Sequence, residues 1–564
     1  MSNFTFNDVP VIRHSRSRFD LSHSIKTSGN VGTLYPFEIQ EVYAGDTFKI
    51  KTSIVSRLSS QFIRPVMDNL FLDVYYFFVP SRLLYDKYVN VFGENTESEW
   101  ANTVEYSTPT VASGSGVSSG TVGDYLGLPP NFTGEVSVLP FRAFAKVYNE
   151  WFRDQNNVQP MHIQTGETAS SEAFNNNAWS PNNYMGLPPK VAKFHDYFTS
   201  SLPAPQKGSA VDLSLGIAQN VPVITGDEHY QYVYPAADIP LRFQGIAQSQ
   251  SSLPSVAGLY GTDQGNVHTL KAGDVSISGQ YGTFSTSGNA GSIEVNGLIP
   301  SNLWAQTENL QFNPVSVNDL RFAFQYQKML ERDARSGSRY VEYLSAHFGV
   351  QAGDYRLQRS EFLGGRRFPI NIQQVVQSTG AGSDTSPLGE LGAYSLSNGS
   401  TRVTKSFVEN GFVIGVYCIR QFHTYQQGVE KFWRRSKRTD YYDPVFSHIG
   451  EQPVYKTELF AEADVEAVFG YNEAWADLRY RPNRVTGQMR SGVTNSLDVW
   501  HFADYYSTVP SLNEQFINET PTYVDRAITV DSSAQNQFIL DFYVSNVAYR
   551  VLPTYSVPSL IDHD

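Results

Sequence analysis

The sequence predicts a mainly β fold in which a few helices decorate strands and long loops. Across most of the 564 residues, short aromatic or β-branched runs are separated by Gly, Pro, Asn and Ser, a pattern typical of strands joined by turns. Several of these runs alternate apolar and polar residues with the period of two that a half-buried strand requires. Helical periodicity is confined to two segments, so helices are not expected to set the architecture.

Three runs predict individual strands. In 45–54 (GDTFKIKTSI), Phe48, Ile50 and Ile54 alternate with polar residues, which predicts a half-buried strand after a Gly-Asp turn. The run 70–79 (LFLDVYYFFV) is apolar on both faces apart from its aspartate, which predicts a strand covered on both sides. A similar run at 538–544 lies near the C-terminus, so we expect a sheet closed by residues far apart in the sequence.

Two segments have helical character. After Pro140, aromatic residues at 141, 144, 148, 151 and 152 form one stripe at helical spacing, which we interpret as core packing. The second segment begins at Asn318 as an N-cap, has Asp319 in its first turn, and keeps high helix propensity until Gly337.

Composition limits the class of protein. With 41% hydrophobic and 17% charged residues, disorder is excluded as the main state, and the net charge of −13 argues against a uniformly basic nucleic-acid clamp while allowing a local basic patch. The one cysteine, Cys418, excludes an intrachain disulfide framework and a zinc site of several thiolates, and its apolar neighbours predict a buried position. No apolar stretch reaches the ~20 residues of a membrane helix, so we expect an unsecreted protein without membrane insertion that folds in a reducing cytoplasm.

The segment 205–310 differs in composition from its flanks. It holds 13 of the 42 glycines but only 11 charged residues, and its local charge is −5. We interpret it as a glycine-rich insertion that projects from the surface, the alternative being a disordered linker. Its aromatic residues provide material for a small core: Tyr230, Tyr232, Tyr234, Phe243, Tyr260, Tyr281 and Phe284. The predicted organisation is an N-terminal basic arm (1–40), a first part of the β framework (41–204), this insertion, and the remainder of the framework (311–564).

The clearest charged feature is 431–438 (KFWRRSKR), which has five cations, two aromatics and no acid. Cations bind phosphates and flat aromatic faces stack on unpaired bases, so the segment suits single-stranded nucleic acid. A structural alternative stays open, in which Glu430, Asp440 and Asp443 neutralise a solvated or intersubunit cationic face. A thinner basic arm precedes the first strand. The candidate nucleic-acid residues are Lys431, Trp433, Arg434, Arg435, Lys437, Arg438, Arg13, Arg16 and Arg18.

Motifs for catalysis were not found. There is no phosphate-binding loop, dinucleotide fingerprint, HExxH, EF-hand loop or GxSxG elbow, so no catalytic residue, cofactor or metal ligand is predicted. His448 and Glu451 have residue types suited to acid–base chemistry, but a single pair in a Gly/Pro-flanked loop is more simply a hydrogen-bonded loop. The abundant carboxylates and aromatics leave one alternative function, a cytoplasmic protein that binds or hydrolyses carbohydrate.

Many short motifs in one order resemble the major capsid proteins of gokushoviruses, small tailless bacteriophages of the Microviridae. The motifs are 18–23 (RFDLSH), 45–48 (GDTF), 67–73 (MDNLFLD), 77–83 (FFVPSRL), 148–154 (YNEWFRD), 331–335 (ERDAR), 362–365 (FLGG), 424–428 (TYQQG), 450–452 (GEQ), 469–471 (FGY), 478–482 (LRYRP), 497–501 (LDVWH) and 557–563 (VPSLIDH). Only the insertion 205–310 and the loop 380–400 fall outside the resemblance.

The resemblance implies a specific fold and function. The fold is a viral eight-stranded antiparallel jelly roll, two packed sheets, which agrees with the strands predicted above. One type of subunit forms a T=1 icosahedral shell around a circular single-stranded DNA genome, with other phage structural or scaffolding proteins as partners. The insertion stands where this family projects from the shell at the threefold axes for host attachment. Its candidate contacts to a host surface receptor, such as a glycan, are the first six aromatics named for its core.

Overall fold

The chain, described by a computed structural model, divides into two compact units. One unit comprises Met1–Ser209 and Lys328–Asp564, and the other comprises Ala210–Gln327. Each unit is described by itself. The structure describes 15–94, 106–112, 116–167, 179–209, 211, 223–225, 242–247, 257–258, 295–300, 303–305, 317–337, 339–376 and 391–555.

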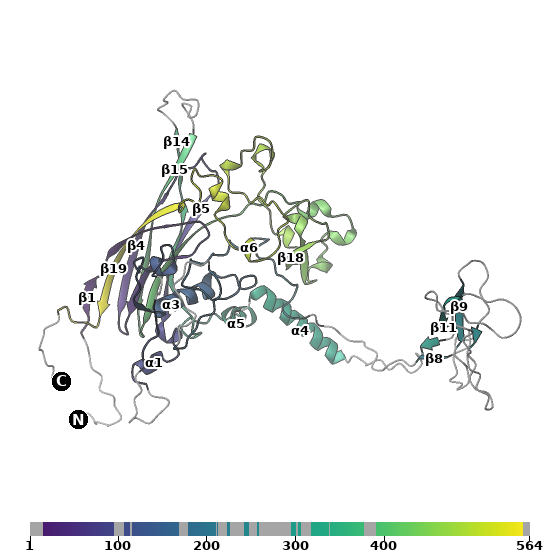
Figure 1. Ribbon diagram of the computed structural model, residues 1–564, viewed down its shortest axis with the longest axis horizontal. Helices are drawn as coiled ribbons and strands as arrows, with labels where there is room; N and C mark the ends of the chain where they lie inside the picture. Colours follow the sequence, from purple (N-terminus) through teal and green to yellow (C-terminus); the bar gives the residue numbers. More distant parts are fainter. Residues whose placement is uncertain are drawn as a thin grey trace, which may run out of the picture. The chain divides into compact units, whose positions relative to one another are not determined.

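The larger sheet of the first unit has six antiparallel strands (Figure 1). In spatial order they are β1 (Ser17–Asp20), β19 (Phe538–Arg550), β4 (Thr47–Leu58), β15 (Leu391–Ser406) and β14 (Ile372–Val376), and β2 (His23–Gly29) also pairs with β19. The strands predicted at 45–54 and 538–544 are therefore confirmed. They pair directly with each other, with Phe542 opposite Ile54, although most of the chain separates them.

The smaller sheet has four antiparallel strands, in the order β13 (Glu361–Ile370), β5 (Leu70–Pro80), β16 (Gly411–Gln421) and β3 (Tyr35–Val42). The predicted strand at 70–79 is confirmed as β5, which lies inside this sheet and is buried along almost its whole length. Cys418 of β16 is fully buried, as its apolar neighbours predict.

The two sheets pack face to face around one apolar core. Phe37 of β3 stacks on Phe542 of β19 with ring centroids 4.3 Å apart. Within the core, the hydroxyls of Thr52 and Tyr76 form a 2.6 Å hydrogen bond between the two sheets, which satisfies two buried groups that would otherwise be costly. This β-sandwich confirms the predicted jelly-roll class, and the short pairings of β1 and β2 with β19 enlarge one of its sheets.

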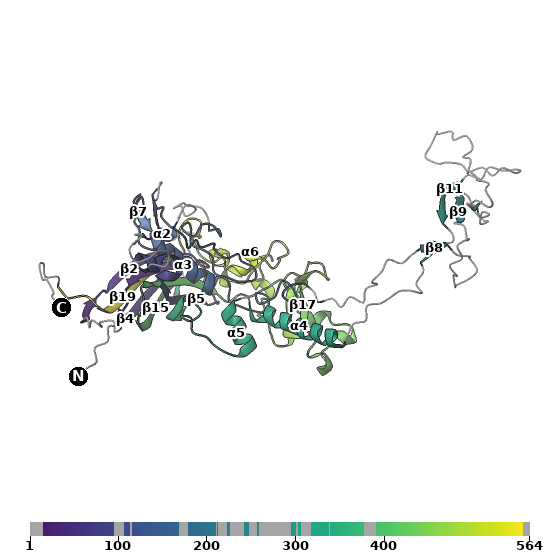
Figure 2. The same ribbon diagram turned by 90° about the horizontal axis from the view of Figure 1, so that it is seen from below.

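A helix covers the second face of the four-stranded sheet. It is α3 (Leu139–Val147), which continues into a π-helical turn over Tyr148–Phe152 and lies beside β5 and β16 (Figures 1 and 2). Phe141, Phe144 and Tyr148 of the predicted aromatic stripe are buried in a second apolar cluster with residues of β5 and β16. The interpretation of this stripe as core packing is thus confirmed.

The second predicted helix is α4 (Val317–Ser336). It begins one residue before Asn318, so this asparagine lies in the first turn and the predicted N-cap is wrong. The helix ends before Gly337, whose φ of +104° is strained for any residue with a Cβ. The remaining helices are α1 (Tyr88–Val91), α2 (Val122–Tyr125), α5 (Tyr340–Phe348), α6 (Glu514–Ile517) and α7 (Thr522–Asp525). None of the helices in the described ranges has the length and apolar character to cross a bilayer.

Two small hairpin-like sheets complete the first unit, β6 (Thr110–Ala112) with β7 (Glu135–Ser137) and β17 (Glu451–Tyr455) with β18 (Val468–Glu473). The second unit contains two small antiparallel sheets. In one, β9 (Arg242–Ala247) lies between β10 (Ala257–Gly258) and β11 (Val295–Pro300). In the other, β8 (Val223–Thr225) pairs with β12 (Leu303–Ala305).

Candidate nucleic-acid interface

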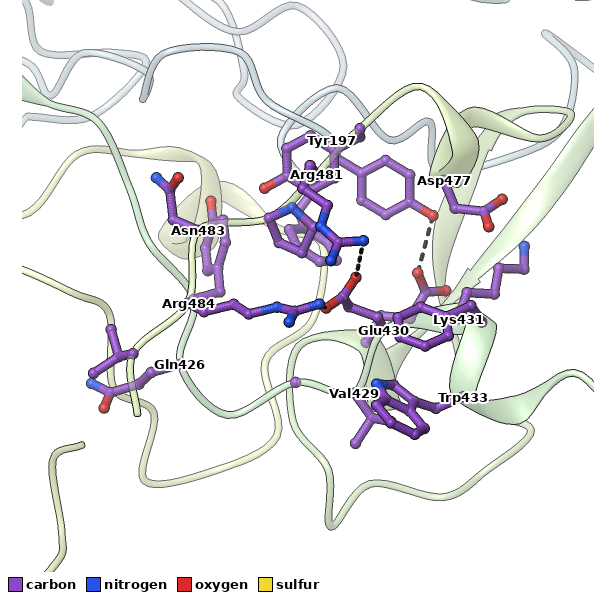
Figure 3. A pocket seen from close by; sticks show the side chains of 18 of the residues that line it. Tyr197, Gln426, Val429, Glu430, Lys431, Trp433, Asp477, Arg481, Asn483 and Arg484 are labelled. Carbon is purple, nitrogen blue, oxygen red and sulfur yellow. Dashed lines mark hydrogen bonds and ion pairs between the residues drawn. The ribbon is translucent and has the colours of Figure 1, made fainter. Parts of the chain in front are cut away.

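The basic segment 431–438 contributes to an open pocket of about 900 Å³ in the first unit, which we call the loop pocket (Figure 3). Its walls come from loops that follow β16, β17 and β18, together with Tyr197 and Phe198. Six cations and three acids line it. They are Lys431, Arg435, Arg479, Arg481, Arg484 and Arg490, with Glu430, Glu458 and Asp477. The lining therefore has an excess of positive charge in a chain whose net charge is −13.

Gly428 allows two of these loops to approach closely. A Cβ atom at this position would overlap the carbonyl oxygen of Glu458. Because the obstacle is backbone and not a flexible side chain, any larger residue would push the loops apart. The glycine thus fixes the distance between the basic segment and the loop that follows β17.

Two of the predicted DNA-binding arginines hold the segment in place. Arg434 donates hydrogen bonds from Nη1 to Thr457 Oγ1 and from Nη2 to the carbonyl of Val465, both at 2.6 Å, and its guanidinium lies 4.9 Å from the ring centroid of Tyr455. Arg435 forms an ion pair with Asp477, and both side chains are mostly buried. These guanidinium groups fasten a 3₁₀ turn (Lys431–Arg434) to its neighbours.

The rest of the segment is available to a ligand. Trp433 is 71% exposed. Lys437 and Arg438 are also exposed, and neither forms an ion pair with any residue that the structure describes. Lys431 is half-buried, and its Nζ donates a 3.2 Å hydrogen bond to the carbonyl of Pro453. One flat aromatic face and two solvated cations are the parts of this segment that suit a nucleic acid.

The opposite wall was missed by the sequence analysis. Arg481 and Arg484 converge on Glu430 (Figure 3), and Arg481 keeps 73% of its side chain exposed. The signal was present: 478–490 (LRYRPNRVTGQMR) holds four arginines and no acid. The signal is weak in the sequence, because arginines spaced through a turn do not form a compact run such as 431–438.

Stacked tyrosines form the floor of the pocket. The rings of Tyr197 and Tyr480 are nearly parallel, with centroids 5.1 Å apart, and Tyr197 donates a 3.0 Å hydrogen bond from its hydroxyl to Glu458 (Figure 3). Burial raises the pKa of the Tyr480 hydroxyl to about 12. These phenols therefore stay neutral, and the charge of the lining comes from the arginines, the lysine and the carboxylates.

A buried ionic network lies next to Tyr425, one of the residues that line the pocket. Asp504 accepts a 2.7 Å hydrogen bond from His423 Nδ1 and a 3.1 Å contact from Lys193 Nζ, and His423 Nε2 lies 3.1 Å from Glu519. Burial opposes charge on His423, but Asp504 and Glu519 outweigh that effect and raise the pKa of the imidazole to about 9. Burial also disfavours charge on Asp504, yet His423 and Lys193 lower the pKa of its carboxyl to about 2. Two cations and two anions thus neutralise each other and join four distant segments.

We expect stability to fall as the pH rises through the titration of His423. Its pKa is above the ordinary value of 6.5, so its contribution is complete below about pH 6.5 and is lost as the pH approaches 9. The contribution of Asp504 behaves oppositely and is lost below about pH 4. Thermal unfolding of the wild type and of His423→Gln between pH 5 and pH 9.5 tests this. The gap between the two melting temperatures should narrow above pH 7, and parallel curves would contradict it.

The N-terminal candidates lie elsewhere. Arg13 is outside the described residues. Arg16, just before β1, and Arg18, on β1 of the six-stranded sheet, are exposed and do not line the pocket. The attachment candidates remain predictions. Tyr230, Tyr232, Tyr234, Tyr260 and Tyr281 lie outside the described residues, and Phe243 is placed only as a position on β9 of the second unit.

The structure gives the pair at 448 and 451 no catalytic geometry. Glu451 forms an ion pair with Arg335, and burial raises the pKa of its carboxyl. His448 is exposed, and within the described ranges no hydrogen bond joins it to Glu451. No cluster of three or more His, Cys, Asp or Glu side chains suited to a metal ion occurs in the part of the chain that the structure describes.

Comparisons with known proteins cover nearly the whole chain. Residues 7–560 match the family model described as Capsid protein (F protein). Capsid protein VP1 of Chlamydia phage 1 is 36% identical over 98% of this chain and 97% of its own length. Capsid protein VP1 of Spiroplasma virus 4 is 36% identical over 99% of this chain and 97% of its own length. Capsid protein VP1 of Bdellovibrio phage phiMH2K is 34% identical over 98% of this chain and 97% of its own length.

Proposed function

This chain belongs to the Capsid protein (F protein) family of bacteriophages, and we propose that its copies close into a T=1 icosahedral shell around a circular single-stranded DNA genome. The protein is a structural component of the virion. The observation that carries the proposal is the similarity along almost the entire length to capsid proteins of three phages. A capsid function requires subunit contacts and genome contacts but no catalysis.

Exposed aromatic side chains support self-assembly. On α5 and the loop after it, Tyr340, Phe348 and Tyr355 are each at least 60% exposed. The ring of Tyr343 joins the first two, with centroids 6.2 Å from Tyr340 and 5.8 Å from Phe348. A cluster of exposed aromatic side chains is typical of protein interfaces. Because capsid proteins assemble with copies of themselves, the proposed partner of this surface is a second copy of this chain.

Sedimentation velocity of the purified full-length protein tests assembly. Co-expression with the other structural or scaffolding proteins of the phage should give one fast-sedimenting species of uniform size. Tyr340→Ser with Phe348→Ser should shift the protein to small, folded species, because the substitutions remove interface area without emptying a core. If these variant particles form as efficiently as the wild type, the surface on α5 is not a subunit contact.

We also propose that the exposed end of the basic segment contacts the genome. Lys437 and Arg438 are solvated, whereas Arg434 and Arg435 are engaged within the protein. Lys437→Ala with Arg438→Ala should therefore leave folding unchanged and weaken binding of single-stranded DNA. Log affinity falls linearly with log salt concentration, and each lost phosphate contact makes that slope shallower by about 0.7.

A filter-binding titration with a thymidine oligonucleotide at several salt concentrations measures that slope. The matched control is Lys207→Ala with Arg356→Ala, which removes the same charge from exposed cations outside the segment. A slope that falls equally in both double variants would reduce the effect to net charge and contradict the proposal.

The insertion 205–310 is proposed as the host-attachment element at the threefold axes. It is neutral to acidic and rich in glycine, while the candidate DNA contacts lie in the other unit. A receptor at the host surface, such as a glycan, is its proposed ligand. The alternative function, a cytoplasmic β protein that binds or hydrolyses carbohydrate, is not favoured, because it does not explain the full-length similarity to capsid proteins.

A further inference from the structure

The outer faces of the two sheets differ. The four-stranded sheet is covered by α3 and its apolar cluster. On the six-stranded sheet, the inward residues of β4 are buried, and the outward residues that alternate with them are exposed or half-buried. The same alternation continues along β15 and β19. In Figure 1, β1, β19 and β4 lie at the margin of the first unit away from α5. We call this outward surface the open sheet face.

Cations are concentrated on the open sheet face. Its exposed outward positions include six cations and two acids. They are Lys49, Lys51 and Arg57 on β4, Arg402 on β15, Lys26 on β2 and Arg18 on β1, with Asp541 on β19 and Asp20 on β1. A local charge of 6 minus 2, or +4, stands against −13 for the chain. Such a segregated field attracts a polyanion.

The pairing within the sheet places like charges together. Lys51 on β4 lies directly opposite Arg402 on β15. Like charges in this position are destabilising, and neither side chain has an ion pair with a carboxylate among the described residues. In the four-stranded sheet, by contrast, the cations Arg367 and Arg420 both form ion pairs with the buried Asp73. Lys26 lies opposite Asp541 on this face, whereas Lys51 and Arg402 thus lack an internal anion among the described residues.

Aromatic groups share the open sheet face with these cations. Tyr543 on β19 is 52% exposed and Tyr394 on β15 is 44% exposed. Lys49 Nζ lies 5.2 Å from the ring centroid of Tyr549. Lys49 and Lys51 are two residues apart on one strand, so their side chains emerge about 7 Å apart. Flat rings beside a row of cations fit a strand with exposed bases, whereas an acidic polypeptide would use only the cations.

We propose that the open sheet face binds single-stranded DNA and provides the main genome-contacting surface of the subunit. The inference rests on the proposed capsid function and deepens it, since it names which surface takes the genome. The basic segment at the loop pocket then adds a smaller contact, because two of its arginines are used within the protein. Phosphates bind the cations of β4 and β15, and unpaired bases stack on Tyr543 and its neighbours.

The test uses the full chain with Lys49→Gln, Lys51→Gln, Arg57→Gln and Arg402→Gln combined. The slope of log affinity against log salt for a thymidine oligonucleotide should become shallower by about 3, because each of the four lost phosphate contacts contributes about 0.7. Nuclease-treated particles should contain less DNA per shell. Lys207→Gln with Arg356→Gln is the control for charge. The double variant Lys51→Gln with Arg402→Gln, which removes a like-charge pair, serves if the fourfold variant does not fold.

Stacking has a separate readout. Tyr543→Leu keeps the apolar area and the charge of the face, so it should lower the affinity for the oligonucleotide by roughly 5- to 100-fold with an unchanged salt slope. Unchanged affinity in this variant removes the stacking role.

The remaining outcomes also decide the proposal. If the fourfold variant has the same salt slope and the same DNA content per particle as the Lys207→Gln with Arg356→Gln control, the proposal is wrong. If the double variant folds but does not assemble, the face is a subunit contact. If the variants lose binding to polyglutamate but keep binding to the oligonucleotide, the face is a protein-docking site. Either outcome overturns the inference. If the wild type itself forms no closed particle, the proposed capsid function fails instead.

Discussion

Replacing residues 212–310 with a short Gly-Ser linker should leave particle assembly intact and reduce adsorption to host cells to the background level. The deleted residues belong to the second unit, and the β-sandwich, the open sheet face and the loop pocket all belong to the first. The linker is attached before α4, so this helix stays complete. Adsorption is measured as the loss of free particles after incubation with the bacterium that supports the phage.

A second deletion provides the control. Removing 380–388, within the other stretch outside the family resemblance, changes a different part of the chain and should leave adsorption as in the wild type. Adsorption that survives the deletion of 212–310 would place attachment elsewhere. If neither deletion variant assembles, adsorption of wild-type particles should instead be blocked by an antibody against 212–310.

Asp504→Asn should destabilise the first unit by about 3 to 5 kcal/mol, the cost of removing one partner from a buried ion pair. The substitution keeps the shape of the side chain but leaves His423 and Lys193 without their shared anion. The network joins segments around 193, 423, 504 and 519, so its loss should also loosen the loops that line the pocket. Urea unfolding of unassembled protein at pH 6 measures the free energy.

Asp541→Asn is the matched control, because this carboxylate is exposed on β19 and forms no ion pair among the described residues. Its effect should remain within about 0.5 kcal/mol. Equal unfolding midpoints for Asp504→Asn and the wild type would show that the network is not a stabilising element.

The fold was predictable where local pattern and tertiary burial agree. The alternation in 45–54 and the two-sided apolar run at 70–79 state directly how many faces of each strand are covered. The aromatic stripe after Pro140 likewise identified α3. The start of α4 was misplaced by two residues, because capping preference competes with the ability of Val317 to join the helix.

The site was less predictable, because its parts are assembled from distant segments. The run 431–438 was visible as a charge cluster, but only the structure shows that Arg434 and Arg435 are satisfied by Thr457, Val465 and Asp477. The open sheet face is invisible in any single run. Lys51 and Arg402 are opposite each other only through the register of β4 and β15. A contiguous sequence motif records local charge, whereas a sheet face collects one residue in two from several strands.

The mass of nuclease-treated particles tests the central claim most directly. Native mass measurement, with negative-stain microscopy of the same sample, should be made on full-length protein co-expressed with the phage structural proteins. The capsid function predicts uniform icosahedral particles with the protein mass of a T=1 shell, some of which protect single-stranded DNA. A stable monomer or open aggregates under all assembly conditions would contradict it.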